Sequence, residues 1–206
     1  MIYLVDNTID GQGLSPREIR AALERLRPGL EIIVERYEEV SLLRINELKP
    51  SHIILSGQSH PWHNYTAESQ AGVFDVIRHA PQPILGLCGG HQQIALAYNA
   101  PVAVMRRLAP GEGYDGCLRE RGFFEVETDR EGIFAGLPRR VTVWHSHYDE
   151  VKELPEGFKR TASNETCPIQ AMRHTSRPIF SVQFHPELFD EDHPHGRRIV
   201  ENFLNL

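Results

Sequence analysis

The sequence predicts an α/β fold, a doubly wound and mostly parallel sheet with helices on both faces. In the first half of the chain, short apolar runs alternate with helical segments, which is the pattern of parallel strands joined by right-handed crossovers. In the second half, loops separate the apolar runs, so we expect an additional, partly antiparallel strand region. No repeat or linker divides the 206 residues, which favours a single domain over residues 1–206.

The elements of the first half follow from apolar spacing. Ser15 is the predicted N-cap of the first helix, with Pro16 at its first position and apolar residues at helical spacing up to Leu26. The predicted strands are 2–5, 31–34, 52–55 and 84–85, and the other predicted helices lie at 43–48 and around 73–77. Three loops, at Asp6, at 56–57 and at Cys88, follow strands, so we expect them to share one edge of the sheet.

In the second half, we expect strands at 102–105, 123–127, 141–144, 169–172 and 179–184, a turn-rich connector at 133–138 and a closing helix at 196–206. These strands lack long helices between them. Part of the sheet is therefore expected to pair antiparallel.

Composition excludes several classes of function. The net charge is −6 with no basic block, so nucleic acid is not an expected partner. No apolar run is long enough for a membrane span and no signal peptide opens the chain, so we expect a cytosolic (cytoplasmic) protein that does not bind membranes. The three cysteines, Cys88, Cys117 and Cys167, are widely spaced, which supports no disulfide framework.

The stretch 83–97 is organised around a cysteine. A short apolar run leads into Cys88, two glycines follow, and a helix-forming segment begins at once. This pattern is typical of a nucleophile elbow with cysteine in the serine position. The thiol would lie near the positive end of a helix, where a thiolate is favoured. The alternative is a buried cysteine at the end of a strand, beside an ordinary glycine turn.

A candidate base for such a nucleophile lies late in the chain. His185 ends a predicted strand, Pro186 stops the pairing, and Glu187 follows two residues after the histidine. The three residue types of a Cys-His-Glu triad are recognised by their roles rather than by chain order. A turn histidine beside a solvated glutamate is the alternative, and the pairing with an elbow cysteine disfavours it.

Three separated motifs carry a family resemblance. The segment 86–92 resembles the Gly-x-Cys-x-Gly-x-Gln elbow of class I glutamine amidotransferases, 184–187 is similar to their histidine–glutamate motif, and Ser56-Gly57 matches the start of their oxyanion loop. The resemblance covers essentially the whole chain. Within the family, 119–122, 144–149, 154–158, 166–168 and the tail from Gly196 are most similar to the glutaminase half of GMP synthases.

The resemblance implies a role for each matching residue. Cys88 attacks the side-chain amide of glutamine and forms a thioester, His185 transfers protons, and Glu187 orients His185. The remaining implied roles are the oxyanion donors Gly57 and Gly89, the substrate contact Gln92, and the residues that line the substrate pocket, Ser146 and His147.

The chain also departs from the family pattern. Gly89 stands where a bulkier residue usually follows the nucleophile, and Gln58 stands where the oxyanion loop usually has a second glycine. We therefore expect the resting loop to differ, or to be closed only by a partner. His91, His145 and Tyr148 depart from the GMP synthase pattern.

The leading hypothesis is a glutamine amidotransferase subunit that hydrolyses glutamine and passes ammonia to a separate synthetase. No Walker-type phosphate loop is present and the chain ends soon after His185, so the acceptor chemistry is expected on another chain, with amination of XMP in nucleotide biosynthesis as the nearest resemblance. The alternatives are a stand-alone γ-glutamyl hydrolase or peptidase, and a non-catalytic regulatory module.

Two histidine-rich loops, 60–63 and 190–195, have metal-ligand residue types without the spacing of a recognised site. We expect polar surface loops there. The first of them, if functional, would shape the pocket rim or a docking face. No metal or cofactor is expected.

Overall fold

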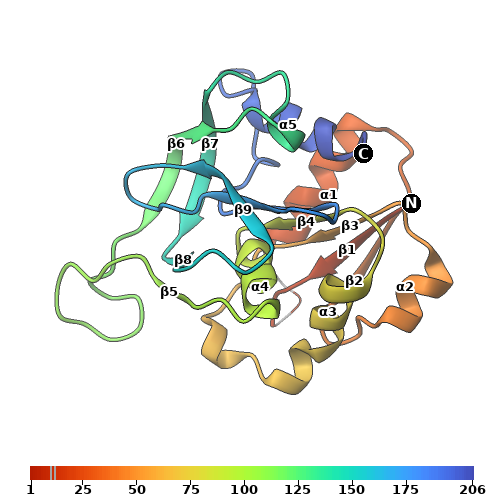
Figure 1. The fold of residues 1–206 in the computed structure, drawn as a ribbon, viewed down its shortest axis with the longest axis horizontal. Coiled ribbons are helices and arrows are strands. Elements are labelled where there is room, and N and C mark those ends of the chain that lie inside the picture. Colours follow the sequence, from red (N-terminus) through yellow and green to blue (C-terminus); the bar gives the residue numbers. More distant parts are fainter. Residues whose placement is uncertain (10, 12) are drawn as a thin grey trace.

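The computed structural model describes residues 1–9, 11 and 13–206, and in them a nine-stranded sheet runs through the protein (Figure 1). Five strands are mutually parallel: β1 (Ile2–Asp6), β2 (Ile32–Arg36), β3 (His52–Leu55), β4 (Ile84–Leu87) and β11 (Ile179–Val182). Four pair antiparallel beyond β11: β10 (Ala171–His174), β9 (Phe158–Ser163), β6 (Glu120–Thr128) and β7 (Arg140–His147). The strand order is β2-β1-β3-β4-β11-β10-β9-β6-β7. The predicted α/β fold with a partly antiparallel region is confirmed.

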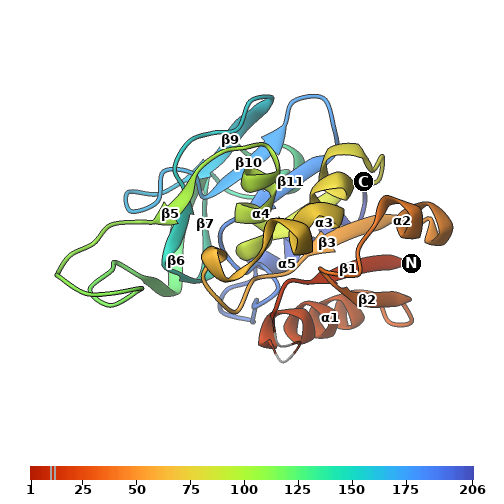
Figure 2. The same ribbon diagram turned by 90° about the horizontal axis from the view of Figure 1, so that it is seen from below.

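Helices cover both faces of this sheet. The described helices are α1 (Leu14–Leu26), α2 (Leu42–Leu48), α3 (Ala67–His79), α4 (Gly89–Ala97) and α5 (His195–Phe203), with short 3₁₀ turns η1 (Trp62–Asn64) and η2 (Gly132–Phe134). One core cluster packs α1 and α5 on one face, and a second packs α2, α3 and α4 on the other. Figure 2 shows α1 and α3 on opposite sides of the strands. None of the described helices is long and apolar enough to cross a membrane.

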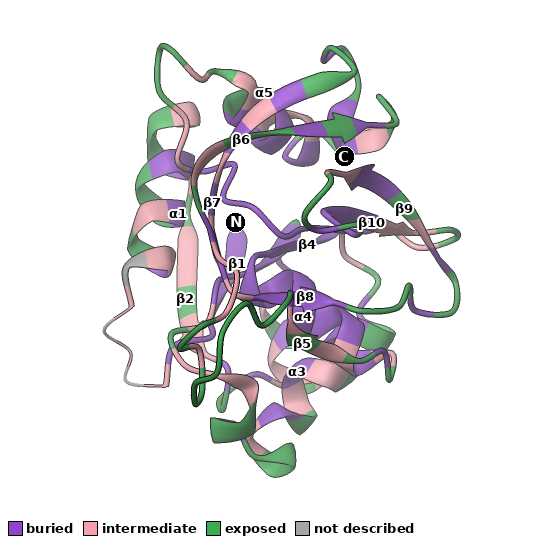
Figure 3. Cartoon of the chain, turned by 90° about the vertical axis from the view of Figure 1, so that its left-hand side faces the viewer, coloured by how far each residue is buried: buried purple, intermediate pink, exposed green. Residues whose placement is uncertain are grey.

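Burial concentrates at the centre of the sheet. Strand β4 is fully buried, and so is most of α4, which packs directly behind it (Figure 3). Short apolar strands of this kind are typical of parallel sheets covered on both faces. The residue that joins β4 to α4 is therefore held between two rigid, buried elements.

The strand ends meet at one edge, as expected. Asn7 follows β1, and its side-chain amide donates to the Ser56 carbonyl after β3 at 2.8 Å and to Gln93 Oε1 in α4 at 2.9 Å. The Ser56 hydroxyl in turn accepts from the Asn7 backbone N–H at 3.0 Å. These buried bonds tie together the loops that follow β1, β3 and β4.

Three sequence expectations need correction. Ser15 was predicted as the N-cap of α1, but Gly13 occupies that position and Ser15 lies in the first turn, where its hydroxyl accepts from the Gly57 N–H. Strand β9 was missed because its sequence, FKRTAS, has no apolar run; its strand state depends on the partners β10 and β6. The three-residue strand β8 (Asp149–Val151), which pairs with β5 (Val102–Val104), was also missed.

Candidate active site

Cys88 lies in a strained turn between β4 and α4. Its backbone has φ 50° and ψ −102°, a region that a residue with a side chain enters at a cost of about 1–3 kcal/mol. The flanking glycines are required by close approach. A Cβ on Gly86 would lie 2.4 Å from the Gly90 carbonyl oxygen, and one on Gly90 would lie 2.3 Å from that of Leu55. Cys88 therefore lies in a strand-to-helix turn with the geometry of a nucleophile elbow.

His185 and Glu187 form a buried pair in the turn after β11. His185 Nδ1 and Glu187 Oε1 are 2.8 Å apart, and the His185 backbone N–H donates to the Trp144 carbonyl at 2.7 Å. Burial alone lowers the pKa of His185, but the Glu187 carboxylate and the Cys88 sulfur outweigh it and hold this pKa well above the usual value. These surroundings therefore favour the charged form of the imidazole.

The thiol of Cys88 opens into two adjoining cavities. One has a volume of about 380 Å³ and is lined by both Cys88 and His185; the other has a volume of about 250 Å³ and also includes Cys88. Cys88 Sγ lies 3.9 Å from the Ser146 carbonyl oxygen and 3.7 Å from Gln183 Nε2. A thiol, an imidazole and a carboxylate thus lie together at one edge of the sheet.

The predicted oxyanion donors lie beside the thiol, but one is already engaged. Gly57 lines the larger cavity, and its backbone N–H donates to the Ser15 hydroxyl at 3.0 Å. Gly89 is the first residue of α4, directly after Cys88. In this resting arrangement Gly57 N–H points at a side chain from α1.

The two departures from the family pattern fit each other in space. A Cβ on Gly89 would lie 2.1 Å from Gln58 Oε1 and 2.3 Å from the Gln58 backbone nitrogen. Gln58 packs on this bare backbone, and its Nε2 donates to Gln92 Oε1 at 3.0 Å. Its Oε1 is buried and has no partner among the described residues. A glycine at position 89 is thus what allows the backbone and side chain of Gln58 to lie this close to the start of α4.

Gln92 is a buried link between several segments. Its Oε1 accepts from Gln58 and, at 2.7 Å, from the Trp62 indole. Its Nε2 donates to the Asp149 carbonyl at 3.1 Å and to Gln183 Oε1 at 3.0 Å. The side chain lines the smaller cavity, but a polar contact with substrate would require one of these bonds to break. The predicted substrate contact of Gln92 stays a prediction.

Ser146 and His147 both line the smaller cavity, in different ways. Ser146 Oγ lies 3.4 Å from an Arg119 guanidinium nitrogen and faces the thiol side of β7. His147 is buried, and both of its ring nitrogens already face protein acceptors, Asp149 O at 2.9 Å and Glu120 Oε2 at 2.8 Å. Only the flank of the His147 ring is left for the cavity wall.

Comparison with known proteins decides the family. The family model for class I glutamine amidotransferases matches residues 17–206. The chain belongs to this family. It is a glutamine amidotransferase, as the resemblance implied, and the predicted enzyme class is confirmed.

Several sequence relatives and solved structures are similar to this amidotransferase. A subunit of the glutamine-hydrolysing GMP synthase of Thermococcus kodakarensis is 43% identical over 169 residues, 80% of each chain. The protein of the same name from Methanosarcina barkeri is 39% identical over 162 residues, 77% of this chain and 74% of its own. A crystal structure from Thermoplasma acidophilum, also described as a GMP synthase subunit, has a TM-score of 0.80 at 32% identity over 99% of this chain and 92% of its own. A glutamine amidotransferase structure from Thermotoga maritima, with a TM-score of 0.68 at 19% identity over 99% of this chain and 82% of its own, shares the fold.

Sequence reasoning missed several residues around the amidotransferase thiol. Gln183 Nε2 faces Cys88 Sγ, and the only sequence signal is a polar residue inside the apolar strand that leads to His185. Tyr114 stacks on Tyr148 with ring centres 4.5 Å apart and donates to Asp149 Oδ2 at 2.5 Å. Tyr114 lies in a glycine-rich loop with no motif of its own, so only the tertiary structure places it in the cavity wall.

A cluster of metal-ligand type lies behind this wall. Ligand atoms of Glu120, His145 and His147 lie within 4.8 Å of one another. The contacts from Glu120 Oε2 to each histidine nitrogen are 2.8 Å, a hydrogen-bond distance. Gln170, Asn164 and Thr166 also donate to this carboxylate. Its lone pairs are engaged by protons, so the described contacts favour a hydrogen-bonded cluster over a metal centre.

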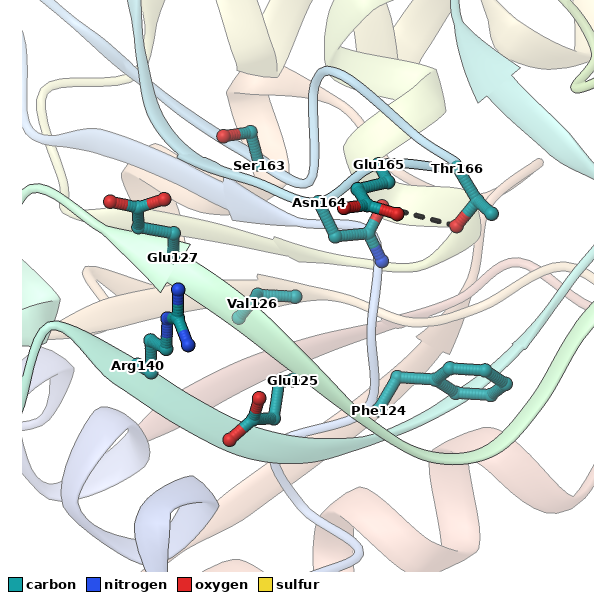
Figure 4. A pocket seen from close by; sticks show the side chains of 9 residues that line it. All are labelled: Phe124, Glu125, Val126, Glu127, Arg140, Ser163, Asn164, Glu165 and Thr166. Carbon is teal, nitrogen blue, oxygen red and sulfur yellow. Dashed lines mark hydrogen bonds between the residues drawn. The ribbon is translucent and has the colours of Figure 1, made fainter.

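Other surface features lie apart from the thiol. A groove of about 480 Å³ lies between β6 and the loop 163–166 and shares no lining residue with the cavities at Cys88. Figure 4 shows the side chains that line it. Of the histidine-rich loops, the first brings His60 to the smaller cavity. In the second, His193 pairs with Asp190 at the surface and His195 Nδ1 accepts from the Thr142 N–H.

Proposed function

We propose that Cys88, His185 and Glu187 are the catalytic triad of this amidotransferase. The observation that carries the proposal is the elbow thiol sharing a cavity with a buried imidazole whose other nitrogen is held by Glu187 at 2.8 Å. The positive charge on His185 supports a thiolate as the attacking group.

The chemistry follows from these positions. Cys88 Sγ attacks the side-chain amide carbon of glutamine, and the carbonyl electron pair moves onto oxygen. When the tetrahedral intermediate collapses, the C–N bond breaks and the His185 imidazolium gives its proton to the leaving nitrogen, which departs as ammonia. His185, now neutral, removes a proton from water as that water attacks the thioester. Glutamate leaves, and the Cys88 thiolate and the His185 imidazolium are restored.

The backbone N–H groups of Gly57 and Gly89 are the proposed oxyanion donors, and Gln92, Ser146 and His147 the proposed walls of the glutamine pocket. Loss of one oxyanion donor typically lowers kcat by ~10²–10³. Because Gly57 N–H donates to Ser15 in the resting structure, we propose that the loop must shift before the site is fully active.

The proposed acceptor of ammonia is a purine nucleotide, XMP, held by a separate synthetase chain. The relatives at 43% and 39% identity are both named as one subunit of a glutamine-hydrolysing GMP synthase, which supports a division of labour between two chains. The proposed partner is thus the ATP-using synthetase subunit, and free glutaminase activity is expected to be low without it.

The triad is tested by covalent labelling. Wild-type protein incubated with 6-diazo-5-oxo-norleucine, a glutamine-analogue electrophile, is expected to gain one adduct that peptide mass spectrometry places on Cys88. Cys88→Ala should gain none and lose glutaminase activity, whereas Cys117→Ala should behave as wild type, because Cys117 lines neither cavity. An unlabelled wild-type Cys88, with or without a synthetase, would remove the proposed mechanism.

The partner is tested by reconstitution. Ammonia release and GMP formation are measured with the chain alone, with an XMP-aminating synthetase, and with both plus ATP and XMP. We expect strong activation of glutamine hydrolysis by the synthetase. Rapid cleavage of γ-glutamyl compounds by the chain alone, with no response to the synthetase, would instead favour a stand-alone γ-glutamyl hydrolase.

A further inference from the structure

Glu120 is a carboxylate at the start of β6 that is almost completely buried, with 2% of its surface exposed. Five side chains donate hydrogen bonds to it. Its Oε2 accepts from His145 Nδ1, His147 Nε2 and Gln170 Nε2 at 2.8 Å each, and its Oε1 accepts from Asn164 Nδ2 at 2.7 Å and from Thr166 Oγ1. The triad mechanism uses none of these contacts.

The two histidines flank Ser146 on β7. In the β6–β7 register, Glu120 lies opposite His147, and Gly122 lies opposite His145. Side chains alternate across a strand, so both histidines point to the buried side with Glu120 while Ser146 faces the cavities at Cys88. Because the Glu120 carboxylate is hydrogen-bonded to the residues on both sides of Ser146, it fixes the backbone position of Ser146.

Short hydrogen bonds hold both rings against the carboxylate. His147 Nδ1 lies 2.9 Å from the Asp149 carbonyl and Nε2 lies 2.8 Å from Glu120 Oε2, so both of its ring nitrogens face acceptors. Burial alone raises the pKa of Glu120, but the two imidazoles outweigh it and hold this pKa well below the usual range. Removing one member would leave a buried charge without its partner.

His145 completes the cluster on the other side of Ser146. Its Nδ1 donates to Glu120, and its Nε2 is buried without a partner among the described residues. Burial lowers the pKa of His145. The cluster thus holds one buried carboxylate between two imidazoles. The Ser146 main chain connects it to the thiol, since the Ser146 carbonyl lies 3.9 Å from Cys88 Sγ.

We propose that Glu120 is a positioning residue for glutamine binding, holding Ser146 in register with Cys88 through His145 and His147. The inference rests on the proposed role of Cys88. Since Glu120 reaches substrate only through β7, its loss should misplace the pocket wall and leave the thiol and its base intact. A displacement of the order of 1 Å can change a rate or affinity by ~10²-fold.

The test compares Glu120→Gln with Glu150→Gln. Glu150 is also buried, but its carboxylate pairs with Lys152 and touches neither histidine. For each protein we would measure KM and kcat for glutamine, the rate of Cys88 alkylation by iodoacetamide, and the melting temperature. Iodoacetamide needs the thiol but not the glutamine pocket, so it separates positioning of the wall from damage to the triad.

For Glu120→Gln we expect KM for glutamine to rise by roughly tenfold to a hundredfold, with iodoacetamide alkylation within about twofold of wild type; Glu150→Gln should keep both values. A Glu120→Gln protein with unchanged KM, or one in which KM and alkylation change together, overturns the inference. Failure of the wild type to react with the glutamine analogue at Cys88 would remove the proposed function first, and this inference with it.

A milder variant decides the matter if Glu120→Gln does not fold. Thr166→Val removes one donor to Glu120 at an exposed position with almost no change in shape. We expect a severalfold rise in KM with unchanged alkylation and melting temperature. An unchanged KM in Thr166→Val would then overturn the inference.

Discussion

Burial and neighbouring charge have opposite effects on the pKa of a single residue, His185. Burial lowers its pKa, and the Glu187 carboxylate and the Cys88 sulfur together raise it by more. Because the folded pKa lies above the unfolded value of about 6.5, the ion pair stabilises the fold fully below that pH, and this contribution is lost as the pH rises through the folded value.

Replacing Glu187 by Gln removes the main cause that raises the pKa of His185, so burial should lower it. We expect the alkaline limb of the kcat/KM profile to move to lower pH and kcat to fall by about tenfold or more. Glu18→Gln is the matched control, since Glu18 and Glu187 line one cavity but only Glu187 hydrogen-bonds the imidazole. An alkaline limb that stays in place in Glu187→Gln would contradict the assignment of His185.

Ser15 is a second single-residue determinant, because its hydroxyl holds the Gly57 N–H in the resting structure. Ser15→Ala removes this competing acceptor. We expect severalfold faster glutamine hydrolysis without synthetase and a correspondingly smaller activation by it, measured as ammonia release. Ser69→Ala is the control, since that hydroxyl donates within the start of α3, to the Thr66 carbonyl. Unchanged basal activity in Ser15→Ala would show that this bond does not restrain the loop.

At the scale of elements, the active edge depends on how the β3 loop packs on the α4 N-terminus. The Gln58 side chain fills the space that a side chain at position 89 would need, since a Cβ there would lie 2.1 Å from Gln58 Oε1 as well as 2.3 Å from the Gln58 backbone nitrogen. The same side chain holds Gln92. Positions 58 and 89 are therefore expected to be energetically coupled.

This coupling is measured with a double-mutant cycle. Gly89→Ala should lower kcat/KM and destabilise the fold by about 1–3 kcal/mol, because the overpacked loop must move. Adding Gln58→Gly removes the opposing side chain and frees the loop backbone, so the double variant should recover part of the loss. Additive effects in the four proteins, by thermal melting and glutaminase assays, would contradict the coupling.

Across the whole molecule, the edge of the sheet opposite Cys88 is tied together by one side chain. Arg177 lies in the β10–β11 turn, and its guanidinium donates to the carbonyls of Ile77, Arg78 and Ala80 at the end of α3 and to the Tyr98 hydroxyl after α4, at 2.6–2.9 Å. Three elements that are distant in sequence share this contact.

Arg177→Lys keeps the charge but replaces the planar fork by a single ammonium group, which cannot reach all four acceptors. We expect a loss of about 1–3 kcal/mol in the free energy of unfolding, measured by urea denaturation. Arg197→Lys is the control, because Arg197 makes an exposed pair with Glu201, a type worth about 0–1 kcal/mol. Equal effects of the two substitutions would contradict the structural role of Arg177.

The sequence by itself determined the parallel half of the sheet and the candidate elbow. Strands β1, β3 and β4 are short apolar runs with glycine or polar residues after them, and these local patterns coincide with the buried strands of the structure. Cys88 between a strand and two glycines is likewise a local signal. Such features are predictable because neighbouring residues determine them.

Only the tertiary structure decided what surrounds the thiol. The Gly57 N–H donates to Ser15, which lies 42 residues earlier in the sequence, and Gln58 packs on Gly89, 31 residues later. The Glu120 carboxylate accepts a hydrogen bond from His147, 27 residues later. No local pattern specifies these contacts, because each depends on which strands are neighbours and in what register. The polar strand β9 was missed for the same reason: its burial is set by its partners, not by its own composition.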